Sequence, residues 1–149
     1  MKLSEEIFAI KLYELEQQFG KLQSQLYICQ QQDHSKIKQQ LRNITDEYLE
    51  NELLLKKSAA GSRSSTVTLL AEAQEEYLRK TRTILNQQLA KQKTLEEQAE
   101  IAALYAEYAI DFAIHSMKNA LIAALKAIDI QMEIEESILN QQIEREELK

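Results

Sequence analysis

A row of small residues, spaced alternately three and four apart, runs through the C-terminal third of this 149-residue chain. The row consists of Ala99, Ala102, Ala106, Ala109, Ala113, Ser116, Ala120, Ala123 and Ala127. On a helix, this spacing places all of them on one seam that a neighbouring helix can approach closely. Large apolar residues such as Phe112 and Leu121 flank the seam on its two sides. Such a helix is buried over most of its circumference, so the central question is what covers it.

Helix-breaking residues are almost absent from the rest of the chain. Proline does not occur, and glycine occurs only at Gly20 and Gly61. Alanine, leucine, glutamate, glutamine and lysine, which dominate the sequence, all favour helices. We therefore predict an all-α protein: a long antiparallel helical hairpin or helical bundle with coiled-coil-like seams, completed by self-association.

The expected organisation is a single all-helical domain over residues 1–149. Ser4 is a good N-cap for a helix over 4–57, and the serine-rich segment 58–66 around Gly61 predicts the one strong turn. Gly61 can adopt a positive φ there. Helical structure then resumes and continues over 67–147.

Two further breaks remain open at the level of sequence. In the first helical region the apolar phase slips near residues 33–35, where Asp33 and Ser35 can both cap a new helix, although a stutter in a continuous helix also fits. In the second region Thr94 and Glu97 match a capping box, so a break near 93–94 competes with an uninterrupted helix.

The last helical segment extends beyond what the N-terminal segment can cover. If the chain folds back about the 58–66 loop, Glu14 lies near Ala109 and the N-terminus is reached near Ala120. Either a second copy covers the remainder, or the first helix breaks near Asp33 and a compact four-helix bundle forms. We favour self-association, because the last helix is longer and more apolar than any segment that could shield it. The predicted subunit-interface residues are Ala120, Ala123, Ala127, Ile130 and Ile134.

The same fold-back predicts bands of like charge along the pair. Lys38 and Arg42 are expected opposite the basic cluster that includes Arg82, and Glu52 is expected to face acidic residues such as Glu75. Most of these charges are expected to belong to a solvated surface.

One row of polar side chains interrupts the apolar C-terminal helix. Glu107, Asp111 and His115 stand four residues apart and share a helix face, so they could hold a metal ion or a small ligand. Carboxylate-bridged sites in helical bundles use two Glu-x-x-His motifs, and this chain has none around Glu107, which is followed at the third position by Ile110. We therefore interpret the row as a solvent-facing edge, and we expect no enzyme activity and no cofactor.

Charge and hydropathy limit the classes of partner. The net charge is −6, and residues 101–149 carry nine acidic and only four basic side chains. A duplex nucleic acid would be repelled by this end, so none is expected as a partner. Charged residues at Glu107, Asp111, Lys118 and Lys126 interrupt the apolar stretch 100–129, which therefore does not predict a membrane span.

The compartment is inferred from two features. Glu5 and Glu6 fall where a secretion signal has an uninterrupted apolar run, and the lone Cys29 cannot form an internal disulfide. We expect a cytoplasmic protein.

The function predicted from these patterns is structural or adaptor-like, exerted through helix packing in a homo-oligomeric bundle. Its expected partners are further copies of the chain or another helical protein. The alternative is a helical-bundle protein that binds a metal or small ligand through the Glu107, Asp111 and His115 face.

Overall fold

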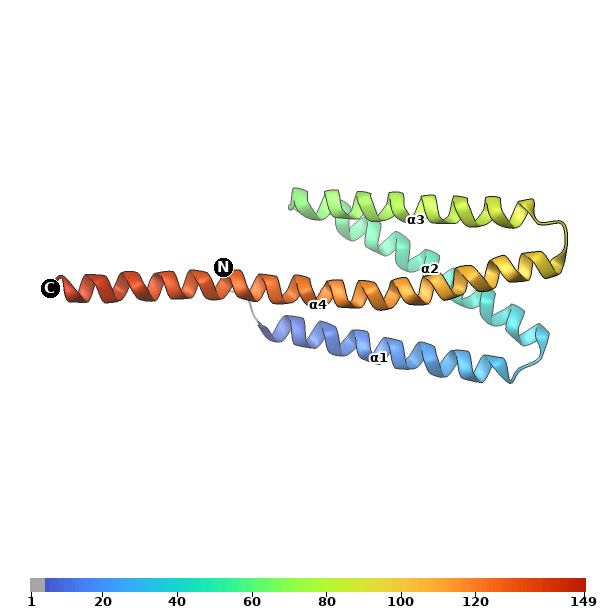
Figure 1. Cartoon of the computed structure of the whole chain (residues 1–149), viewed down its shortest axis with the longest axis horizontal. Coiled ribbons are helices and arrows are strands. Elements are labelled where there is room, and N and C mark those ends of the chain that lie inside the picture. Colours follow the sequence, from blue (N-terminus) through green and yellow to red (C-terminus); the bar gives the residue numbers. More distant parts are fainter. Residues whose placement is uncertain (1–4) are drawn as a thin grey trace. The chain divides into compact units, whose positions relative to one another are not determined.

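The computed structural model describes residues 5–149 and folds them into four helices (Figure 1). Helix α1 spans Glu5–Gln30, α2 spans His34–Ala60, α3 spans Ser65–Lys91 and α4 spans Leu95–Glu147. No strand occurs over the described residues. The predicted all-α class is confirmed, whereas the predicted N-cap at Ser4 lies outside the described residues.

The first junction lies at residues 31–33, where the sequence left open a break or a stutter. Asp33 has extended backbone angles and caps α2: its carboxylate accepts hydrogen bonds from the Lys36 amide at 3.0 Å and from the Ser35 hydroxyl at 2.8 Å. These two bonds, the amide first, lower the pKa of Asp33. The N-terminal half of the chain is therefore two helices.

The second junction is shorter than the predicted loop. Helix α2 continues to Ala60 and α3 begins at Ser65, so only residues 61–64 connect them instead of 58–66. Gly61 has φ −82° and ψ −5°, so the expected positive φ is wrong. The Gly61 amide still donates to the carbonyl of Lys57 at 3.1 Å, which continues the helical pattern to its end. The alanines before Gly61 favour this extension because alanine is the best helix former.

The third junction contains the capping box that the sequence suggested. The Thr94 hydroxyl accepts a hydrogen bond from the Glu97 amide at 3.2 Å. In return, the Glu97 carboxylate accepts from the amides of Thr94 at 3.3 Å and Lys93 at 2.9 Å. These bonds satisfy amides at the start of α4 that have no partner within the helix. Gly61 is thus one of three breaks rather than the only strong one.

The chain divides into two compact units. One comprises residues 22–106, and within it α2 and α3 form a close helix pair. The other comprises the first part of α1, to Lys21, and residues 107–149 of α4. In this second unit the half-buried side chains of α1 are Phe8, Leu12 and Leu15, which belong to its predicted apolar seam.

Neither unit contains a closed core. Among the described residues no side chain is buried, and many large apolar side chains remain largely exposed. The break near Asp33 that a compact four-helix bundle requires is present.

Candidate interaction surface

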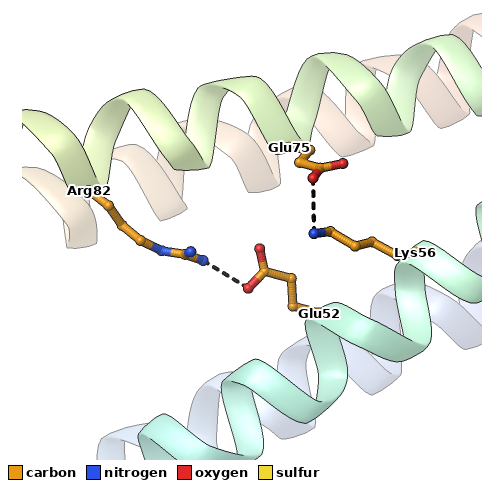
Figure 2. A network of polar contacts seen from close by, with 4 residues as sticks. All are labelled: Glu52, Lys56, Glu75 and Arg82. Carbon is orange, nitrogen blue, oxygen red and sulfur yellow. Dashed lines mark hydrogen bonds and ion pairs between the residues drawn. The ribbon is translucent and has the colours of Figure 1, made fainter.

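Two ion pairs link α2 to α3 (Figure 2). A guanidinium nitrogen of Arg82 lies 2.8 Å from the Glu52 carboxylate, and Nζ of Lys56 lies 2.9 Å from the Glu75 carboxylate. Each helix contributes one acid and one base, so the two pairs have opposite polarity. Two pairs of opposite polarity favour one register, because sliding the helices would bring like charges together.

Arg82 also lies over an aromatic ring of α2. Its guanidinium carbon is 5.8 Å from the centroid of the Tyr48 ring, which is within the range of a cation–π interaction. The interaction with the Tyr48 side chain, followed by the hydrogen bond to Glu52, raises the pKa of Arg82. The hydrogen bond to Glu75 and its negative charge likewise raise the pKa of Lys56.

These contacts correct the predicted charge bands. Glu52 faces Arg82 rather than the acidic residues of α3, and Glu75 faces Lys56. The fold-back estimate assumed that facing positions are counted evenly from the turn. The two helices instead pair in a register in which opposite charges face each other. This register is displaced along both helices from the estimated one.

Residues of α2 and α3, including the ion-paired Glu52, Lys56 and Glu75, line an open groove of about 270 Å³. Its apolar lining includes Leu55, Ala59, Ala71 and Leu78, and its charged groups include the already paired Lys56 and Glu75. No histidine or cysteine lines it. The groove therefore offers a mainly apolar surface between charged groups.

The predicted seam of α4 is exposed in the structure. Ala120 and Ala123 are exposed, Ala127 is half-buried, and Ile130 and Ile134 retain 49% and 48% of their accessible surface. The earlier alanines of the row, from Ala99 to Ala113, are exposed as well. The five predicted interface residues thus share one helix face, on which Ala127 is half-buried and the other four are exposed.

A second row on α4 is partly covered. Met117, Ala124 and Gln131 are half-buried, and they stand seven residues apart along one side of the seam. On the other side of the seam Asn119, Lys126 and Glu133 are exposed. The free face of this part of α4 is therefore the seam, in which Ala127 is half-buried and the other four residues are exposed, together with the Lys126 side.

The alternative polar row is present as a helix face but does not form a centre. Glu107, Asp111 and His115 lie on α4, and all three are exposed. Over residues 5–149, no three His, Cys, Asp or Glu side chains are grouped so that they could hold a metal ion.

The ion-paired layer between α2 and α3 was missed at the level of sequence, although a signal for it exists. Ala71, Glu75, Leu78, Arg82 and Leu85 repeat at steps of four and three, so Glu75 and Arg82 occupy seam positions of α3. Charged residues at seam positions call for partners of opposite charge on the facing helix.

Comparison with known proteins gives no match: no family model, no curated protein and no solved structure resembles the chain. Across the part of the chain that the structure describes, none of the helices combines the length and the apolar character needed to span a bilayer.

Proposed function

We propose that this chain is a structural or adaptor-like protein that acts by packing its helices against further copies of itself. The observation that carries the proposal is the missing core: hydrophobic residues make up 44% of the sequence, yet no described side chain is buried. Large apolar surfaces that remain exposed on a protein generally mark sites of association.

Helix α4 is the element best suited to the contact. It is the longest helix, with 53 residues, and its small-residue seam permits close approach of another backbone. Exposed residues such as Ile122, Leu125 and Met132 on its other faces can be covered only by additional helices. A bundle of several chains satisfies this demand, and its role is to hold chains together or to present their free ends.

The test is the molar mass of the purified protein by light scattering at micromolar concentration. We expect an oligomer for the wild type. Replacing both Ala123 and Ala127 by glutamate buries unpaired charges where the helices approach most closely, at a cost of several kcal/mol in order of magnitude. This variant should dissociate or unfold.

Lys118→Glu provides the matched control. It changes the net charge by the same two units on the same helix, at an exposed position outside the seam. It should leave the molar mass unchanged. A monomeric wild type would contradict the proposal, and so would an Ala123→Glu/Ala127→Glu variant that assembles normally.

A further inference from the structure

The free face of α4 has a charge pattern that is complementary to itself. The seam positions Ala120, Ala123, Ala127, Ile130 and Ile134 follow a heptad pattern, and the exposed row beside them consists of Asn119, Lys126 and Glu133. Lys126 and Glu133 are one heptad apart and have opposite charge. No other side chain of residues 5–149 forms an ion pair with either of them.

We propose that the C-terminal half of α4 pairs with the same segment of a second copy in antiparallel orientation, with the two-fold axis between Ile128 and Asp129. This inference rests on the proposed function and names its interface. In such an isologous contact each interaction occurs twice.

The packing along the seam supports this orientation. Antiparallel pairing about this axis places Ala123 opposite Ile134 of the second copy and Ala127 opposite Ile130. Each of these two alanines then receives a large residue, and both isoleucines are about half exposed in the single chain. Parallel pairing would instead place every alanine opposite its own copy, which leaves those layers poorly filled.

The flanking charges select the register among antiparallel alternatives. In antiparallel coiled coils the residues on one side of the seam face the same side of the partner. With the axis between Ile128 and Asp129, Lys126 faces Glu133 of the second copy, and the symmetry repeats the pair. A shift of one heptad moves the axis either to Leu125 or to Met132. With the axis at Leu125, Lys126 faces Lys126 of the second copy. With the axis at Met132, Glu133 faces Glu133 of the second copy. Both shifted registers bring like charges together.

The half-buried row on α4 is compatible with this contact. Met117, Ala124 and Gln131 lie on the opposite side of the seam from Lys126 and are the partly covered side of the helix. The second copy therefore meets the face that is free.

Cysteine pairing tests the orientation and register directly. In a Cys29→Ser background, single variants Ala123→Cys and Ile134→Cys are prepared separately, then unfolded together, refolded and oxidised. We expect an intermolecular disulfide in the mixture and none in either variant alone. In the proposed register, residue 123 of one copy lies opposite residue 134 of the other. The two residues 123 are therefore 11 positions apart, about 16 Å along the helix, which is beyond the reach of a disulfide.

Charge reversal tests the contact independently. Lys126→Glu alone creates two repulsive pairs in place of two attractive ones, and Glu133→Lys alone does the same. Each should weaken self-association by about tenfold. A mixture of these two variants restores both attractive pairs and should associate at least as tightly as the wild type. Lys118→Glu, the same chemical change outside the contact, should have no effect.

The outcomes separate this inference from the proposed function. Disulfides in each single-cysteine variant alone would show parallel pairing and overturn the inference. An oligomeric wild type that gives no disulfide in the mixture, or no rescue by the mixed charge variants, would overturn the inference while the proposed function stands. A monomeric wild type overturns the proposed function itself.

Discussion

Replacing threonine by alanine should lower the stability of the protein in the capping box at the start of α4 and raise it inside α3. Thr94→Ala removes the hydroxyl that accepts from the Glu97 amide at 3.2 Å, and this amide then has no partner within the helix. Loss of such a cap costs about 1 kcal/mol. Thr83 lies inside α3, where its hydroxyl donates to the Arg79 carbonyl at 2.9 Å. Thr83→Ala should stabilise by up to about 0.5 kcal/mol, because alanine is the better helix former in an exposed helix interior.

The assay is urea unfolding followed by circular dichroism, with all variants at one protein concentration because the proposed association would contribute to stability. Thr94→Ser keeps the hydroxyl and should resemble the wild type. The two alanine variants should differ by about 1.5 kcal/mol, or several degrees in thermal midpoint for a chain of this size. If Thr94→Ala proves as stable as Thr83→Ala, the box does not stabilise α4 and the reasoning is wrong.

Three further predictions concern the other junctions and the α2–α3 pair. A double-mutant cycle between Arg82→Ala and Glu52→Ala should give a coupling energy of at most about 1 kcal/mol, reduced by added salt, and zero coupling would contradict the ion pair. Because the folded-state pKa of Asp33 is lowered, its stabilising effect is present above its unfolded pKa and is lost as pH falls through the folded value. Asp33→Asn keeps an N-cap and should remove that part of the acid sensitivity, measured as the thermal midpoint from pH 5 to pH 2. Trypsin should first cleave at exposed Arg63 in the 61–64 connection, and first cleavage within α2 would contradict its helical continuity.

Local signals were the part of the fold most accessible from sequence. The scarcity of glycine and proline predicted helices throughout, and the Thr94–Glu97 spacing offered, beside an uninterrupted helix, the helix start that the structure has. These features depend on residues within four positions of one another, so a single sequence contains them completely. Gly61 was given too much weight, because its neighbours are alanines that extend α2 and the turn needs no positive φ.

The relation between helices was harder to predict, and the reason is visible at the α2–α3 pair. Counting residues from the turn ignores the reach of long side chains and the angle at which two helices cross. The Glu52–Arg82 and Lys56–Glu75 pairs place the helices in a register that such counting does not give. The candidate interface on α4 could be located from spacing alone, because one face of a helix is a local property. Under the proposed function the partner that covers this face belongs to another chain, and a single sequence does not contain its position.

A chain that closes no core on its own should gain stability from its concentration. Its apolar residues, including Ile130 and Ile134, remain about half exposed in the single chain, so in the proposed assembly their burial accompanies association. Folding and assembly are then one equilibrium, and mass action adds stability as concentration rises. A hundredfold increase in protein concentration should raise the thermal midpoint by about 5 °C, followed by circular dichroism. Lys118→Glu should show the same slope, whereas Ala123→Glu/Ala127→Glu should show a smaller one or none. A midpoint independent of concentration in the wild type would mean that one chain buries its own apolar surface, contrary to the exposure described above.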